Sequence, residues 1–313
     1  MTTDRIIQRV IITGPTGAIG TALCRLLVER GIQVYAICRP GSPRRKALPE
    51  SSLLRVVECD ASHLVRLPDL LPEGADAFFH LAWAKTVGAG RNDMPAQIQN
   101  IQYTVDACHA AAELGCQVFV GAGSQAEYGR VEGLLKPETP CFPENGYGMA
   151  KLCAGQMSRV ECERLGVDHI WIRILSVYGP RDGENSMISS TIRELMLGEV
   201  PSLTPGEQLW DYLYADDAAS ALYLAALKGH NGSVYPLGSG EARPLREYVE
   251  LLRDTVNPEL PLGFGRVSYG PRQIMHLQAD ISNLQADTGF APAVTFETGI
   301  QNTVAYIRNE KDE

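Results

Sequence analysis

The chain has 313 residues, of which 45% are hydrophobic, enough to build one large core or two smaller ones. Its formal net charge of −9 and sequence pI near 5.3 argue against nucleic acid as a partner, because phosphate binding needs a basic surface. No apolar run approaches the roughly 18 residues that span a bilayer, and the N-terminus lacks the apolar segment of a signal peptide, so we expect a soluble, cytoplasmic protein.

Strand and helix patterns alternate through the first 175 residues. The predicted strands are 9–13, 33–38, 54–59, 77–82, 117–121 and 168–175. Two long helices, at about 95–114 and 147–165, end at Gly115 and Gly166, as helices commonly do. Because parallel strands need helical crossovers, this order predicts an α/β fold with a doubly wound (Rossmann) parallel sheet.

The regular alternation of strand and helix patterns ends at Ser176. A helix is predicted at about 186–197, a strand at 211–214 and an alanine-rich helix at 215–228. After Gly238 we expect shorter elements, with loops rich in proline and glycine around 257–272. The pattern predicts a dinucleotide-binding domain formed by residues 1–175 and 211–237. Residues 176–210 and 238–313 are predicted to form a smaller α/β substrate-binding domain.

A glycine-rich loop follows the first predicted strand. The segment Thr13-Gly-Pro-Thr-Gly-Ala-Ile-Gly20 has the spacing G-x-x-G-x-x-G and opens a helical pattern. Glycines let the backbone approach a pyrophosphate, and the helix N-terminus offers unpaired N–H groups and a partial positive charge. The loop therefore predicts a dinucleotide site, with contacts from Gly14, Thr16, Gly17, Ala18, Ile19 and Gly20.

A second motif, Tyr147-Gly-Met-Ala-Lys151, places a phenol and an ammonium four residues apart, on one helix face. The ammonium, helped by the charge of an oxidised nicotinamide, would pull the pKa of Tyr147 from about 10 toward neutrality. Ser124, expected at the end of the fifth strand, would hydrogen-bond the oxygen of the substrate. Together these residues predict a dinucleotide enzyme whose catalytic residues are Ser124, Tyr147 and Lys151, with Tyr147 as the acid–base group.

These motifs resemble the extended short-chain dehydrogenase/reductase family, which includes UDP-galactose epimerases, nucleotide-sugar dehydratases and 4-ketoreductases. The resemblance covers essentially the whole chain. It is carried by Thr13–Gly20 (TGxxGxxG), the HxA strand at 80–82, Ser124 with Tyr128-Gly129, residues 173–180 (R-x-x-N-x-YGP), 211–216 (RDFxxVxD) and 280–292. It implies cofactor contacts also at Asp60, Ala61, Leu81, Ala82, Trp83, Lys85, Asn100, Tyr147, Lys151 and Leu175.

The same resemblance implies substrate contacts at Ser124 and Gln125 and a homodimer packed through the helices that carry Asn100 and Tyr147. Two positions depart from the family pattern. Trp210 stands in place of an arginine that grips the pyrophosphate of the substrate, and Ser176 replaces an asparagine. Losing a bidentate arginine contact weakens phosphate binding unless another cation substitutes. Arg266 and Arg272 are candidates, and the expected substrate residues include Ser176, Trp210 and Arg272.

The end of the second predicted strand favours NADP(H) over NAD. An NAD enzyme places a carboxylate there to bind the ribose hydroxyls. This chain has Cys38 and Arg39 instead, followed by Arg44 and Arg45. A guanidinium suits the 2′-phosphate of NADP(H), and Arg39 is the main candidate.

The residues after Ser124 argue against sugar dehydration. The 4,6-dehydratases of the family carry an Asp-Glu pair where this chain has Gln125 and Ala126, neither of which can transfer the required protons. We expect NADPH-dependent reduction of the 4-keto group on a nucleotide-linked 6-deoxyhexose, with Tyr147 as general acid. The alternatives are a nucleotide-sugar epimerase with tightly bound NAD(P), a reductase of a non-nucleotide ketone or aldehyde, and a non-catalytic NADP-sensing regulator.

The eight cysteines are scattered, with no C-x-x-C motif and no clustering with histidine. Several fall in predicted strands or helices, where a small buried hydrophobe is expected. The sequence therefore predicts neither a metal site nor a catalytic cysteine.

Overall fold

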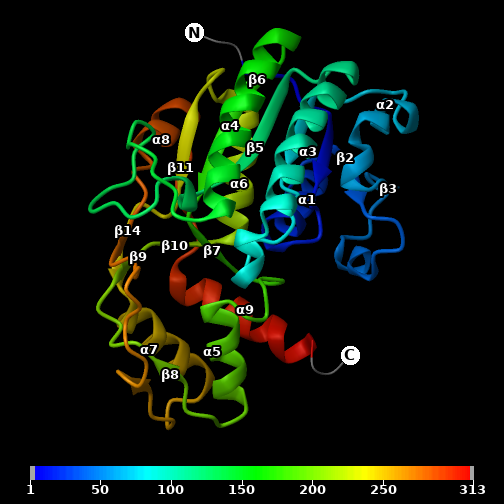
Figure 1. The fold of residues 1–313 in the computed structure, drawn as a ribbon. Coiled ribbons are helices and arrows are strands. Elements are labelled where there is room, and N and C mark those ends of the chain that lie inside the picture. The colour runs from blue at the N-terminus through cyan, green and yellow to red at the C-terminus, as the bar shows by residue number, and fades with distance from the viewer. Residues whose placement is uncertain (1–3, 311–313) are drawn as a thin grey trace.

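The computed structural model describes residues 4–310 (Figure 1). Its centre is a seven-stranded sheet in the order β11-β6-β5-β4-β1-β2-β3, with every neighbouring pair parallel. The strands are β1 (Arg9–Thr13), β2 (Gln33–Cys38), β3 (Leu54–Glu58), β4 (Ala77–His80), β5 (Val118–Ser124), β6 (Asp168–Ile174) and β11 (Val234–Leu237). The predicted doubly wound sheet is confirmed. The strand order reverses between β1 and β4, where ligands of such sheets bind.

Helices cover both faces of this sheet because its strands are apolar on both sides. In β1, Val10 and Ile12 pack into one buried cluster, whereas Ile11 packs into the other. The first cluster includes α1 (Ala18–Glu29), α6 (Ala215–Lys228) and α8 (Ser282–Thr288). The second includes α2 (Leu67–Leu70), α3 (Met94–Glu113) and α4 (Gly146–Leu165). The sheet is thereby buried on both faces.

Two strands differ from their predicted bounds by more than one residue at one end. Strand β5 continues to Ser124, three residues beyond the predicted end, and β4 stops at His80. The expectation of shorter elements after Gly238 is wrong for two helices, α7 (Leu245–Val256) and α9 (Phe296–Glu310). In α7, Tyr248, Val249 and Leu252 are buried on one face, which stabilises a full helix.

A third buried cluster lies beyond the carboxyl edge of the sheet, in the lower part of Figure 1. It joins α5 (Met187–Met196), α7 and α9 to the parallel pair β7 (Ser176–Tyr178) and β10 (Tyr212–Tyr214). Tyr178 is at its centre, with its ring centroid 5.0 Å from that of Phe296 and 5.6 Å from that of Tyr214. Short strands complete this region: β8 (Ser202–Leu203) pairs with β13 (Gly263–Phe264), and β9 (Leu209–Trp210) pairs with β12 (Arg243–Pro244) and β14 (His276–Leu277).

The C-terminal part of the chain also contributes to the large sheet. Leu277, Ala279, Leu284 and Phe290 belong to the buried cluster of β1 and α6 rather than to the third cluster. The division of the chain into two domains stays a prediction. None of the helices within residues 4–310 is both long and apolar enough to cross a bilayer.

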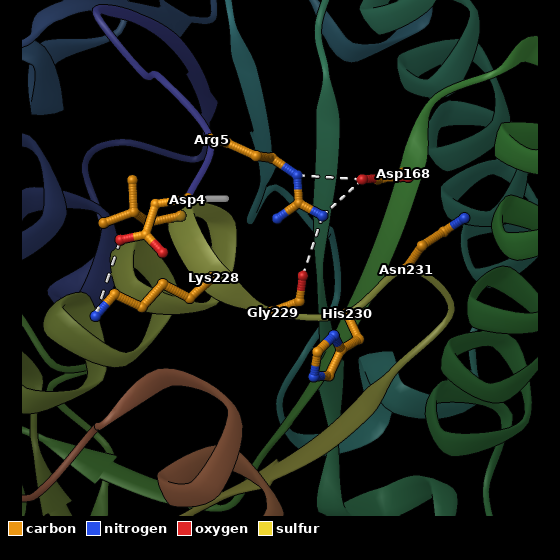
Figure 2. Close-up of a pocket in the computed structure, with 8 residues that line it drawn as sticks. Asp4, Arg5, Asp168, Lys228, Gly229, His230 and Asn231 are labelled. Carbon is orange, nitrogen blue, oxygen red and sulfur yellow. Dashed lines mark hydrogen bonds and ion pairs between the residues drawn. The ribbon is translucent and has the colours of Figure 1, made fainter. Parts of the chain in front are cut away.

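Figure 2 shows a cavity of about 310 Å³ at the amino end of β6, opposite the edge where ligands are expected. The Nη2 of Arg5 lies 2.6 Å from the Asp168 carboxylate, and its Nη1 donates to the carbonyl of Ala226 over 2.9 Å. Lys228 lies 4.0 Å from Asp4. These charges neutralise one another and tie the first described residues to β6 and α6, so we interpret this cavity as structural.

Candidate active site and cofactor cleft

The three glycines of the loop after β1 have different tasks. Gly14 has a φ of +70°, and a Cβ there would lie 2.8 Å from the backbone nitrogen of Ala82. A Cβ on Gly20 would overlap the Gly14 carbonyl oxygen. Gly17 is the N-cap of α1, has no side-chain cap, and leaves a Cβ no protein atom nearer than 4.0 Å. Gly14 and Gly20 thus let the loop fold, and Gly17 keeps the space before the helix N-terminus open.

A cleft of about 420 Å³ lies beside this loop, at the carboxyl ends of β2 and β4. Of the predicted cofactor residues, it is lined by Gly14, Thr16, Arg39, Ala61, Ala82, Trp83, Lys85 and Asn100. The open helix N-terminus and a cleft of this size suit a dinucleotide. Individual cofactor contacts stay predictions, including those of Gly17, Ala18, Ile19, Gly20, Asp60, Leu81, Tyr147, Lys151 and Leu175.

The arginines after β2 separate into two groups. Arg39 is exposed and borders the cleft, as does Arg44 in the 3-10 turn η1 (Pro43–Ala47). Arg45 instead lies 2.9 Å from the Glu58 carboxylate, to which it is ion-paired. Two of the three arginines therefore border the cleft.

Side chains of α3 hold the segment that follows β4. Asn100 accepts a hydrogen bond from the backbone nitrogen of Ala84 and donates one to its carbonyl, each over 3.0 Å. Gln97 accepts from the indole Nε1 of Trp83 over 2.9 Å and donates to the carbonyl of Lys85 over 3.1 Å. Asn100 borders the cleft as predicted, but its amide is occupied by the backbone. The role of Gln97 was not predicted.

The three predicted catalytic residues come together at the carboxyl edge. Ser124 ends β5, and Tyr147 lies in the first turn of α4, which Asn145 caps by accepting from the nitrogen of Gly148 over 2.9 Å. Lys151 follows one turn later, 3% exposed, with its Nζ 6.0 Å from the centroid of the Tyr147 ring. Tertiary structure thus places a hydroxyl, a phenol and an ammonium side by side.

The Nζ of Lys151 makes two closer contacts. It donates to the carbonyl of Ala122 over 2.6 Å and lies 3.8 Å from the ring centroid of Trp83. The ring of Trp83 also meets that of Tyr147 edge-on, with centroids 6.1 Å apart. Trp83 therefore forms a wall shared by both catalytic side chains.

Burial governs the protonation of this site. It lowers the pKa of Lys151 to about 7, against the opposing effect of the negative charge of Glu127. Burial raises the pKa of Tyr147, opposed by a hydrogen bond with Ser124 and by the charge of Arg91. In the protein alone the shift of Tyr147 thus runs opposite to the predicted one, because burial outweighs the nearby cations.

A buried ion pair supports Ser124 from behind. The carboxylate of Glu127, which is 0% exposed, accepts from the backbone nitrogen of Ser124 over 2.8 Å and from the Nε of Arg173 over 2.8 Å. It also accepts from the indole Nε1 of Trp171 over 3.0 Å. The sequence placed Arg173 in a motif but gave no sign that Glu127 would pair with it, since the two are 46 residues apart.

The residues predicted to bind substrate lie on several different elements. Trp210 donates to the Oγ of Ser176 over 2.8 Å, and Gln125 lies in the 3-10 turn η4 (Gln125–Glu127) after β5. Arg272 is exposed and forms no ion pair within residues 4–310. Arg243, which was not predicted, is the register partner of Trp210 in β12 and β9.

No group of histidine, cysteine, aspartate and glutamate side chains in the described part of the chain could hold a metal ion. All eight cysteines are free. Six of them are buried, namely Cys24, Cys38, Cys59, Cys108, Cys116 and Cys162, as expected for small core residues.

A glycine loop that opens a helix at the switch point of a parallel sheet, with a tyrosine–lysine pair and a serine at the same edge, defines a nicotinamide-dinucleotide enzyme of the extended short-chain dehydrogenase/reductase type. Comparison with known proteins agrees. The model of the NAD dependent epimerase/dehydratase family matches residues 10–238, and the chain belongs to this family.

Its relatives include both epimerases and reductases. The chain is 27% identical over 314 residues to the uncharacterized UDP-glucose epimerase YtcB of Bacillus subtilis (strain 168), covering 96% of this chain and 98% of that protein. It is 25% identical over 319 residues to dTDP-4-dehydro-6-deoxyglucose reductase of Escherichia coli, covering 96% and 97%. Among solved structures, UDP-N-acetylglucosamine 4-epimerase from Methanobrevibacter ruminantium M1, in complex with UDP-N-acetylmuramic acid, superposes with a TM-score of 0.87 at 25% identity, covering 99% and 100%. The protein is thus an NAD(P)-dependent enzyme of a family of epimerases, dehydratases and reductases.

Proposed function

We propose that the protein reduces the 4-keto group of a nucleotide-linked 6-deoxyhexose with NADPH. The observation that carries the choice of NADPH is the placement of Arg39 and Arg44 beside the cleft, where an NAD enzyme would have a carboxylate. A guanidinium can grip the 2′-phosphate through two parallel hydrogen bonds. An enzyme that exchanges NADPH at each turnover is a reductase rather than an epimerase that recycles one bound cofactor.

The site residues suit proton donation. When bound, the dinucleotide supplies the hydride that reduces the carbonyl carbon. Ser124, held by Glu127 at the end of β5, orients the carbonyl oxygen, and Tyr147 gives its phenolic proton to that oxygen. Because burial raises the pKa of Tyr147, this residue stays protonated at neutral pH, as a general acid must. We assign to Lys151 the binding of the nicotinamide ribose.

Dehydration finds no support in these side chains. Gln125 is an amide, and Ala126 is a buried methyl group. Neither can protonate a leaving hydroxyl or remove a proton from carbon. Several relatives are dTDP-glucose 4,6-dehydratases, at 24–28% identity, so the family includes that reaction, but we do not propose it for this chain.

Two other functions are each supported by one observation. The names of the Bacillus and Methanobrevibacter relatives favour a nucleotide-sugar epimerase, which needs the same Ser124, Tyr147 and Lys151. Trp210, in place of a phosphate-binding arginine, favours a reductase of a non-nucleotide ketone or aldehyde. Arg243 lies across from Trp210, and its Nη1 lies 3.4 Å from a carboxylate oxygen of Glu297, so this carboxylate would compete with a substrate phosphate for the guanidinium.

The test is to identify the cofactor by mass spectrometry of the protein as purified and then to assay NADPH oxidation with dTDP- and UDP-linked 4-keto-6-deoxyglucose. The proposal expects an exchangeable NADP site and NADPH consumption that depends on the sugar nucleotide. Firmly bound NAD with interconversion of UDP-sugar epimers would replace it by the epimerase. Activity on simple ketones, with none on nucleotide sugars, would show instead a reductase of a non-nucleotide ketone or aldehyde.

We also propose a homodimer formed through α3 and α4. These helices pack side by side on one face of the sheet (Figure 1). Together they expose five large apolar side chains, Met94, Ile98, Met149, Met157 and Val160, each about half exposed or more. Since exposed apolar surface is costly in water, a second copy that covers these helices would bury it. Light scattering on the wild type and on Met157→Asp would test this: the proposal expects a dimer that the aspartate dissociates.

A further inference from the structure

Arg91 lies against the proposed general acid. It belongs to the 3-10 turn η3 (Gly88–Asn92), and its guanidinium carbon is 4.8 Å from the centroid of the Tyr147 ring. Its Nε is buried and has no hydrogen-bond partner, and no carboxylate within residues 4–310 forms an ion pair with it. Because a guanidinium stays protonated in proteins, this is a permanent and unneutralised charge on the face of Tyr147.

The turn that carries Arg91 is fixed to the helix that carries Tyr147. The backbone nitrogen of Gly146 donates to the Oδ1 of Asn92 over 2.9 Å. A Cβ on Gly146 would lie 3.0 Å from the Arg91 carbonyl and 2.8 Å from the end of the Met94 side chain, so the absence of a side chain at Gly146 lets the two elements approach closely. The position of Arg91 is therefore built into the contact between η3 and α4.

The other charged groups around Tyr147 cannot supply the same effect. Lys151, on α4, has a pKa lowered to about 7 by burial, and its Nζ is turned to the Ala122 carbonyl. His80, on β4, is neutral, since burial lowers its pKa to about 3. Glu127, in η4, is negative and raises the pKa of Tyr147, while Arg173 on β6 is paired with that carboxylate. Arg91 is the one fully charged cation in contact with the phenol among the described residues.

We propose that Arg91 is a second cation of the catalytic site, which stabilises the anionic form of Tyr147 from its ring face. The inference rests on the proposed role of Tyr147. During reduction the cofactor's hydride brings an electron pair to the carbonyl carbon, and the carbonyl oxygen takes the proton from the Tyr147 Oη. The O–H bond of the phenol breaks, and the negative charge is left on the phenolate whose ring the guanidinium faces. In the reverse direction the phenolate takes the proton back from the alcohol.

The test compares Arg91→Met and Arg91→Lys with Arg130→Met, an exposed arginine that is paired with Glu144 instead. With NADP⁺ bound, the ionisation of Tyr147 is followed as the difference in phenolate absorbance between each protein and its Tyr147→Phe version. We expect the midpoint to rise by about one pH unit in Arg91→Met, by less in Arg91→Lys, and not in Arg130→Met. An unchanged midpoint in Arg91→Met, or an equal rise in Arg130→Met, would overturn the inference.

A kinetic measurement links the same charge to catalysis. For alcohol oxidation, which needs the phenolate, the acidic limb of the kcat profile should move up with the titration, with a loss of about tenfold at neutral pH in Arg91→Met. The KM for NADP⁺ should stay unchanged. A substitution that merely disrupted the site would change this KM as well. The absorbance titration needs no turnover. If Tyr147→Phe kept wild-type activity, the proposed function would fail while the titration still decided whether Arg91 acts on Tyr147.

Discussion

The indole Nε1 of Trp210 donates a hydrogen bond to the hydroxyl oxygen of Ser176 over 2.8 Å. These are the two positions at which the sequence departs from the pattern of its family. They lie on different short strands, β9 and β7, and Trp210 also packs against both the sheet core and the third buried cluster. Since one position supplies the donor and the other the acceptor, the two departures form one structural unit.

This pairing can be measured by a double-mutant cycle. Ser176→Ala leaves a half-buried indole N–H without its acceptor and should cost about 1 kcal/mol in the free energy of unfolding. In a Trp210→Phe background the donor is already gone, so the same serine change should cost much less. Urea unfolding of the four proteins gives the coupling energy, which we expect near 1 kcal/mol. Additive effects would show that the hydrogen bond contributes nothing.

Replacing Tyr147 by phenylalanine removes only the phenolic hydroxyl. Turnover should fall roughly 10²- to 10⁴-fold, the usual contribution of a positioned acid, whereas the Kd of the cofactor should change little. Steady-state kinetics and fluorescence titration of NADPH measure the two quantities separately. Turnover close to that of the wild type would remove Tyr147 from the mechanism.

Arg39→Ala tests the choice of cofactor. A charge-assisted contact to the 2′-phosphate is worth about 1.5–3 kcal/mol, so the Kd of NADPH should rise roughly ten- to a hundredfold. NADH has no such phosphate, and its Kd should stay almost the same. Arg45→Ala is the matched control because Arg45 pairs with Glu58. Equal losses for both cofactors would make Arg39 structural, and a wild-type preference for NADH would favour the epimerase.

Two glycines of the same loop should respond differently to alanine. The nearest protein atom to a methyl group at Gly17 would be the Gly14 carbonyl oxygen, 4.0 Å away. The free energy of unfolding should therefore change by less than about 0.5 kcal/mol. The methyl would occupy the space at the helix N-terminus, so cofactor affinity should fall about tenfold or more. Gly20→Ala would overlap the Gly14 carbonyl and should cost about 2 kcal/mol or more. Thermal unfolding with and without NADPH separates the two effects, and similar behaviour would contradict the assignment.

Lys151 should make the stability of the protein alone depend on pH. Its pKa is about 7 when folded, against the ordinary 10.5 expected when unfolded. Between these values the unfolded chain binds one more proton, so this residue makes the free energy of unfolding rise with pH. Lys151→Met should lose that rise. Urea unfolding of both proteins from pH 7 to pH 10 gives the difference between their free energies of unfolding at each pH. The cysteines also contribute to the pH dependence of stability in this range, but their contributions are the same in both proteins and cancel in the difference. Parallel curves would show that Lys151 is charged when folded.

The doubly wound sheet, the glycine loop and the tyrosine–lysine spacing could all be predicted from the amino-acid sequence. Each of these depends on local rules: apolar runs of strand length, glycines at a strand–helix turn, and two residues one helical turn apart. Ser124 followed from its place near the end of a predicted strand, even though β5 ends three residues later than predicted.

Contacts between residues far apart in the sequence could not be predicted, because they depend on how separate elements pack together. Gly121 and Gly123 on β5 leave room for the indole of Trp171, which reaches Glu127 from the neighbouring strand β6, and no local pattern marks that contact. The pairing of Trp210 with Ser176 and the approach of Arg91 to Tyr147 likewise depend on how separate loops pack. The protonation of the site was decided in the same way. Several elements together bury Tyr147 and Lys151, and this burial is the largest cause of both pKa shifts. The four-residue spacing in the sequence could therefore not predict in which direction either pKa would shift.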